Sequence, residues 1–132
     1  MVMLFTNSIN LLDLRPGRAA KSFFIIWGCS LFLMPVMENT YMLLPPAGCL
    51  TAYLPYDTRR RGMMGDAGSN ALGISLGVYY CIGASMYQKI IITSVLIMLH
   101  IAAEKISLTG VIDRSSVLKF IDGIGIKRSD RV

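Results

Sequence analysis

Charged residues are scarce in this chain. They make up 16 % of its 132 residues, whereas apolar residues make up 54 %, and the mean hydropathy is +0.56. A soluble domain carries about 25 % charged residues. The charges are also segregated, which leaves long uncharged stretches of the kind that a membrane protein requires. The composition argues against a soluble protein and predicts a membrane protein.

Metal-binding and nucleophilic side chains are also few. The chain has one histidine and three cysteines, all three within apolar segments and none in a CxxC pair. Zinc spacing, a Walker loop, a dinucleotide fingerprint and a Ser–His–Asp arrangement are absent from the sequence. We interpret Cys29, Cys49 and Cys81 as small buried side chains.

The net charge is +5. The basic residues do not alternate with aromatic residues, and no recognition motif is present, so we expect no nucleic-acid partner. Positive charge that flanks apolar segments is instead a topology signal.

Four apolar segments predict an all-α membrane protein with about four transmembrane helices in one membrane domain. They cover residues 19–37, 40–56, 70–87 and 89–103. Pro45-Pro46 predicts a break or kink in the second helix. In the cytoplasmic tail, residues 104–132, apolar side chains recur at helical spacing after Ser115-Ser116. They predict a short interfacial helix, or a helix that packs on the protein's own loops.

The basic residues also predict an orientation. If the region around Asp13 is cytoplasmic, twelve of the 13 basic residues lie on the cytoplasmic side of a four-span topology, and only Lys89 lies outside. A two-span topology would leave one basic cluster on the wrong side. We therefore expect a multi-pass protein of the cell membrane with a cytoplasmic C-terminus.

A first polar cluster precedes the first apolar segment, where Asn7, Asn10 and Asp13 recur every three residues. On a helix they would share a face, and two amides with a carboxylate can bind a sugar, a base edge or a metal. Arg15 and Arg18 could contact phosphate through paired N–H groups. The alternative is a polar cap before a membrane helix, with the arginines as topology signals.

A second cluster, the glycine-rich stretch Met64–Gly73, lies between Arg59–Arg61 and the third apolar segment. Glycines let a backbone approach a ligand closely, and Asp66 can hold a hard divalent cation through oxygen. The N–H groups that open the next helix can face an anion. These features predict a pyrophosphate-bearing substrate at a bilayer surface. The alternative is an ordinary loop.

His100 lies near the cytoplasmic end of the fourth segment, with Glu104 four residues later on the same helical face. An ionisable side chain within a membrane segment is a functional candidate. The alternative, which we favour, is an interfacial His–Glu pair that ties the helix end to its neighbours.

The two clusters resemble the motifs of one enzyme family. Asn10-Leu11-Leu12-Asp13, followed by Gly17, resembles the Asn-Leu-x-Asp-Gly-x-Asp-Gly motif of the polyprenyl-phosphate N-acetylhexosamine-1-phosphate transferases. Met64-Gly65-Asp66-Ala67-Gly68-Ser69, with Leu72-Gly73, resembles that family's second cytoplasmic motif. This family, classed as glycosyltransferase family 4, includes phospho-N-acetylmuramoyl-pentapeptide transferase and the undecaprenyl-phosphate N-acetylglucosamine-1-phosphate transferases.

The resemblance implies a function in the synthesis of bacterial cell-wall polymers. Such phosphotransferases move a sugar-1-phosphate from a UDP-sugar to a polyprenyl phosphate lipid and release UMP, with Mg²⁺ as cofactor. By this analogy Asp66 would be a magnesium ligand and, with Asp13, a catalytic residue. The resemblance further implies that the substrate is bound by the other polar and glycine residues of the two clusters, namely Asn7, Asn10, Arg15, Arg18, Gly65, Gly68 and Ser69.

Two departures from the family concern the completeness of the site. An adjacent Asp-Asp pair, which the family carries on an earlier cytoplasmic loop, is absent from the sequence. Members have about ten spans, whereas this chain offers four, so we expect the C-terminal portion of a larger transferase. A missing N-terminal half or a separate chain would then complete the site, and the chain alone would be inactive. The alternative is a non-enzymatic four-span protein, either a partner subunit or a transporter-like unit.

Overall fold

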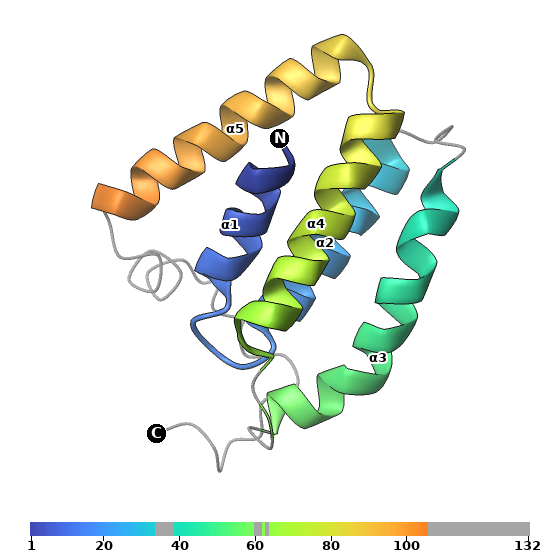
Figure 1. Cartoon of the computed structure of the whole chain (residues 1–132), viewed down its shortest axis with the longest axis vertical. Helices are drawn as coiled ribbons and strands as arrows, with labels where there is room; N and C mark the ends of the chain where they lie inside the picture. The colour runs from blue at the N-terminus through green and yellow to red at the C-terminus, as the bar shows by residue number, and fades with distance from the viewer. Residues whose placement is uncertain (34–38, 60–61, 63, 106–132) are drawn as a thin grey trace.

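The computed structural model describes residues 1–33, 39–59, 62 and 64–105, and these residues form helices without any strand. Five α-helices follow one another along the chain, with one 3₁₀ helix before the third (Figure 1). The predicted all-α class is confirmed. The elements are α1 (Val2–Leu12), α2 (Arg18–Leu33), η1 (Thr40–Leu43), α3 (Leu44–Thr58), α4 (Gly65–Gly83) and α5 (Met86–Lys105).

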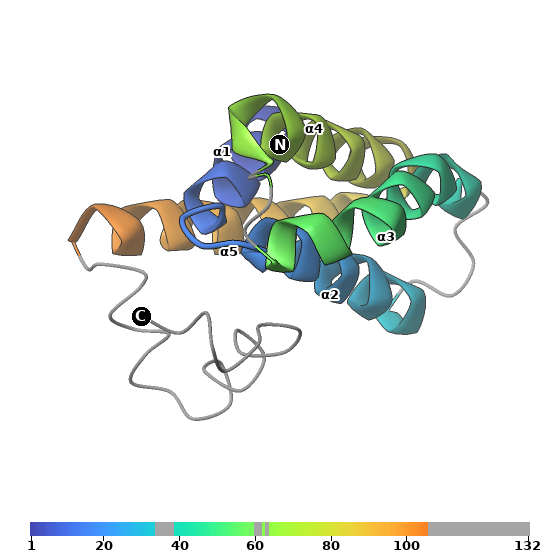
Figure 2. The same cartoon turned by 90° about the horizontal axis from the view of Figure 1, so that it is seen from below.

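Helices α1 and α4 lie side by side, with α2 and α3 beneath them in the view of Figure 2. The close approach depends on a stripe of small buried residues in α4, Ser69, Gly73 and Gly77. A Cβ at Gly73 would clash with the backbone of Thr6 and lie 2.9 Å from the carbonyl oxygen of Phe5. A Cβ at Gly77 would meet the α1 backbone at 2.7 Å. Such a stripe is typical of tightly packed helices in membranes.

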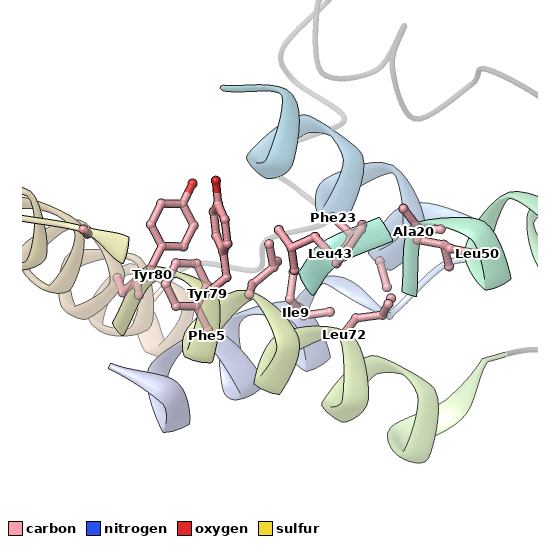
Figure 3. Close-up of a cluster of buried hydrophobic side chains, with 14 residues drawn as sticks. Phe5, Ile9, Ala20, Phe23, Leu43, Leu50, Leu72, Tyr79 and Tyr80 are labelled. Carbon is pink, nitrogen blue, oxygen red and sulfur yellow. The ribbon is translucent and has the colours of Figure 1, made fainter. Parts of the chain in front are cut away.

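Aromatic side chains join α2 to this pair (Figure 3). Phe5 stacks on Tyr80 with ring centroids 5.1 Å apart, and Tyr79 lies edge-on to Tyr80 at 5.2 Å. The hydroxyl of Tyr79 lies 3.3 Å from Ser30 Oγ of α2, so the polar end of this buried ring is hydrogen-bonded within the bundle.

The proline pair of the second segment occupies the first turn of α3, where a missing backbone N–H is tolerated. The helical geometry changes directly before the pair, from η1 to α3, so the predicted break lies at its N-terminal side. A further proline, Pro55, lies inside α3 and removes one of its backbone hydrogen bonds.

Helix α5 begins earlier than the sequence indicated because Ser85 and Gln88 form a capping box. The backbone N–H of Ser85 donates to Gln88 Oε1 at 2.9 Å, and that of Gln88 donates to Ser85 Oγ at 3.5 Å. The chain therefore turns at Ala84-Ser85, and the predicted connection at Gln88-Lys89 is wrong.

One helix of the described residues is long and apolar enough to cross a membrane. This candidate span, Met86–Ala103 in α5, has a mean hydropathy of 1.6, and 6 % of it is buried inside the molecule. Helices α2 and α3 have 16 and 15 residues, fewer than the ~20 that span a bilayer untilted. Membrane association thus has one clear candidate helix, and the four-span topology stays a prediction. The predicted interfacial helix of the tail lies outside the described residues.

The cysteines differ in exposure. Cys29 and Cys49 are exposed and Cys81 is partly buried, and all three are free thiols. The interpretation of Cys29 and Cys49 as buried side chains is therefore wrong, because Cys29 lines a surface hollow on α2 and Cys49 lines an open groove between α3 and α4.

Candidate functional site

The two polar clusters of the sequence meet where the end of α1 lies beside the start of α4. Ser69 Oγ donates a hydrogen bond to Asn10 Oδ1 at 3.0 Å, which joins residues 59 positions apart in the chain. The small-residue stripe of α4 brings these helices close enough for this contact. Asn10 and Ser69, predicted separately as substrate-binding residues, therefore belong to one site.

The Gly-Asp-Ala-Gly-Ser stretch forms the first turn of α4. Gly65 has φ +65°, in the left-handed region that favours glycine, and Asp66 is exposed in that first turn. The predicted segment began at Asn70, which is wrong, because the stretch is itself helical. Within this turn Ser69 Oγ also lies 3.2 Å from the carbonyl oxygen of Gly65. The helix dipole places positive potential at this end, where a carboxylate or a phosphate is stabilised.

Gly68 lies one residue before Ser69, and a Cβ on it would clash with the side chain of Met64. Glycine at this position allows Met64 to pack against the turn that carries Asp66.

Asp13 lies directly after α1 and close to two further carboxylates. Its backbone N–H donates to the carbonyl oxygen of Asn10 at 3.1 Å, which ends the helix one residue before Asp13. Burial, followed by the negative charges of Asp57 and Asp66, raises the pKa of Asp13 to about 6. The ends of α1 and α3 and the start of α4 thus bring together a three-carboxylate cluster, Asp13, Asp57 and Asp66, in which the latter two charges act on Asp13.

Asp57 is a site residue that the sequence analysis did not identify. It is 1 % exposed, and its Oδ2 accepts a hydrogen bond from the backbone N–H of Gly17 at 2.9 Å. Its Oδ1 is buried without a hydrogen-bond partner among the described residues. Burial raises the pKa of Asp57, although the Gly17 hydrogen bond and the charge of Lys21 oppose the shift. The sequence did contain a signal for Asp57. This carboxylate directly follows the second apolar segment, on the same predicted side of the membrane as Asp13 and Asp66.

Gly17 holds the loop between α1 and α2 against the end of α3. It has φ +76°, and a Cβ on it would lie 2.9 Å from Cγ2 of Thr58. The loop that carries Asp13 is thus fixed by Asp57 and by close packing on Thr58.

The two predicted phosphate-binding arginines differ in exposure. Arg18 opens α2 and is 5 % exposed, whereas Arg15 is partly exposed. The backbone N–H of Arg18 donates to the carbonyl oxygen of Arg15 at 3.2 Å, which closes the turn around Pro16-Gly17. Of the two, Arg15 has the better access to a ligand.

Asn7 and Asn10 share one face of α1, as their spacing predicted. They line a pocket of about 290 Å³ between α1 and α5, and its other lining residues are Leu11, His100 and Ala103. His100 thus lies beside the first cluster. The predicted pair with Glu104 cannot be placed, since the Glu104 side chain lies outside the described residues.

An apolar groove of about 540 Å³ runs between α3 and α4. It begins at the turn that carries Asp66 and continues along the bundle. Its wall includes Pro46, Leu50, Tyr53, Met64, Gly68 and Leu72.

The described residues contain no group of three or more His, Cys, Asp or Glu side chains arranged to hold a metal ion. Magnesium, however, usually binds through one or two carboxylates and completes its shell with substrate phosphates and water. Asp66 is exposed, and Asp13 is near enough to respond to its charge. Asp66 therefore offers an exposed carboxylate to an ion of that kind.

The chain was also compared with known proteins. No family model matches it, and neither a curated protein nor a solved structure does.

Proposed function

We propose that this chain is the C-terminal portion of a bacterial polyprenyl-phosphate sugar-1-phosphate transferase. The enzyme would transfer the sugar-1-phosphate of a UDP-sugar to a polyprenyl phosphate at the cytoplasmic face of the cell membrane, for cell-wall polymer synthesis. The observation that carries the proposal is the hydrogen bond between Ser69 and Asn10, since it links the two motifs on which the family resemblance rests.

The carboxylates support a division of roles. Asp66 would hold Mg²⁺, which when bound neutralises pyrophosphate charge and stabilises the departing UMP. A carboxyl group with a pKa of about 6, such as Asp13, exchanges a proton readily near neutral pH. Asp13 would therefore accept the proton of the attacking lipid phosphate, while Asp57 fixes the loop that carries Asp13.

The groove between α3 and α4 supports a lipid substrate. Its wall is mostly apolar, and Met64 and Gly68 at its start belong to the turn of Asp66. A polyprenyl chain in this groove would place its phosphate beside the carboxylates.

The test begins with the DNA upstream of the Met1 codon. We expect an open frame that encodes further apolar segments and an Asp-Asp pair, and Mg²⁺-dependent release of UMP by the complete protein. A stop codon and a ribosome-binding site before Met1 would contradict the fragment interpretation. Ion flux in liposomes without nucleotide would favour the non-enzymatic four-span alternative.

A further inference from the structure

The side chain of Tyr53 joins α3 to the connection between α3 and α4. Its hydroxyl donates a hydrogen bond to the carbonyl oxygen of Gly62 at 2.7 Å, and this bond is exposed to solvent. Tyr53 also lines the groove between α3 and α4. Gly62 lies four residues after the end of α3 and four residues before Asp66. The phenol group therefore holds the connection from the helix that precedes it.

The same hydroxyl lies within electrostatic reach of the three-carboxylate cluster. Asp57 follows Tyr53 by four residues on α3, so the two residues share a face of that helix. The negative charges of Asp57 and Asp13 both act on the Tyr53 hydroxyl. A phenol beside carboxylates keeps its proton and remains a hydrogen-bond donor. Tyr53 thus lies where the groove, the connection and the carboxylates meet.

The turn that carries Asp66 depends on the path of this connection. Gly65, the first residue of α4, has φ +65°, which lets the chain turn sharply into the helix. A Cβ at Gly62 or at Gly65 would meet nothing within 4 Å, so neither residue is closely packed on that side. The hydrogen bond from Tyr53 gives this open part of the chain a fixed point on α3.

We propose that Tyr53 is a positioning residue, whose hydroxyl holds the connection through Gly62 and so sets the place of the Asp66 carboxylate at the start of the groove. The aromatic ring lines the groove with or without the hydroxyl, so phenylalanine at this position separates the two roles. The importance of this placement for the reaction rests on the proposed function, in which Asp66 holds Mg²⁺. A loosened turn would spread the carboxylate over several positions, so a higher Mg²⁺ concentration would be needed to fill the site.

Pulsed electron spin resonance on the full chain in detergent micelles tests the positioning without metal or substrate. Spin labels are attached at Gly48→Cys in α3 and at Ala67→Cys beside Asp66, both exposed positions, in a variant whose three native cysteines are replaced. We expect Tyr53→Phe to broaden the distribution of distances between the two labels at least about twofold, since the connection loses its hydrogen bond. Tyr56→Phe is the matched control, because it makes the same change on an exposed tyrosine of α3 outside the groove wall. It should keep the wild-type width.

A second measurement is the Mg²⁺ requirement of UMP release by the complete protein that contains this chain. Tyr53→Phe should raise the half-saturating Mg²⁺ concentration at least about threefold, and Tyr56→Phe should not. A loss of folded protein alone would lower the maximal rate and leave this concentration unchanged, so the readout separates positioning from stability.

The proposal is overturned if Tyr53→Phe keeps the wild-type distance distribution or the wild-type Mg²⁺ requirement, or if Tyr56→Phe changes either one equally. Because the spin-label measurement omits Mg²⁺ and lipid, it is independent of transfer. A broadened distribution without UMP release by the wild-type complete protein contradicts the proposed function alone. UMP release with an unchanged distribution contradicts this inference alone.

Discussion

Asp57 connects the loop before α2 to the three-carboxylate cluster. It accepts the N–H of Gly17, 40 residues earlier in the chain, and its charge acts on Asp13. These two effects can be separated by substitution, because asparagine keeps an acceptor oxygen and loses the charge. The sequence did not predict the role of Asp57, since its burial arises only when the loop and α3 meet.

Asp57→Ala should destabilise the fold by about 1–3 kcal/mol, because the buried N–H of Gly17 loses its acceptor. Asp57→Asn should cost clearly less. Chemical unfolding in detergent micelles, followed by circular dichroism, measures both. Equal stability of the two variants would show that the hydrogen bond contributes little.

The same cluster predicts a pH dependence. The pKa of Asp13 is raised from 3.8 to about 6, so the folded state binds its proton more tightly than the unfolded chain does. The contribution of Asp13 to stability is therefore fully present below about pH 3.8 and is lost as the pH rises through about 6. Asp57→Asn and Asp66→Asn should each lower the pKa of Asp13. Carbon-13 NMR of the Asp13 carboxyl measures it, and a wild-type value near 4 would be inconsistent with the cluster.

The pairing of α1 with α4 holds the site together. The stripe of Ser69, Gly73 and Gly77 faces α1, so the position of Asn10 relative to Ser69 depends on backbone contact between the helices. The spacing of these small residues could be seen in the sequence. The helix that packs against them could not, because α1 has only 11 residues and was too short to stand out as an apolar segment. The Ser85-x-x-Gln88 pattern of the capping box was also present in the sequence, but the start of α5 was predicted from hydropathy alone, which does not detect such a pattern.

Gly73→Ala should destabilise the fold by about 1–3 kcal/mol, since the added Cβ overlaps the backbone of α1. Gly48→Ala in α3 is the matched control, because a Cβ there meets nothing within 4 Å. Alanine at this second position should be neutral or stabilising by up to about 1 kcal/mol. The unfolding measurement described for Asp57 compares them, and equal stabilities would disprove the close α1–α4 contact.

The complete helical assembly was only partly predictable. Apolar segments indicated the helices from α2 to α5 because burial and lipid exposure both select apolar residues. Charge asymmetry placed both polar clusters on one side, which agrees with the Asn10–Ser69 contact. The number of membrane spans could not be predicted in the same way. Several helices are shorter than a bilayer requires, and among the described residues one helix, α5, has the length and hydropathy to cross a membrane.

The predicted orientation can be tested with single cysteines in a variant whose three native cysteines are replaced. Because basic residues stay cytoplasmic, Gly62→Cys, in the arginine-rich connection, should react with a membrane-impermeant maleimide only after cells are permeabilised. Tyr87→Cys, exposed in the first turn of α5 and beyond the opposite end of α4, should react in intact cells. If Gly62→Cys reacted in intact cells and Tyr87→Cys only after permeabilisation, the predicted topology would be inverted and both polar clusters would lie outside the cell.

The most direct test is the rate of Mg²⁺-dependent UMP release by the complete protein that contains this chain. Asp66→Ala should lose most of that activity, because the proposed magnesium ligand is removed. Ala67→Ser, an exposed neighbour in the same turn, should keep it. If Asp66→Ala released UMP at a near-wild-type rate, the two motifs would not form a magnesium-dependent transferase site.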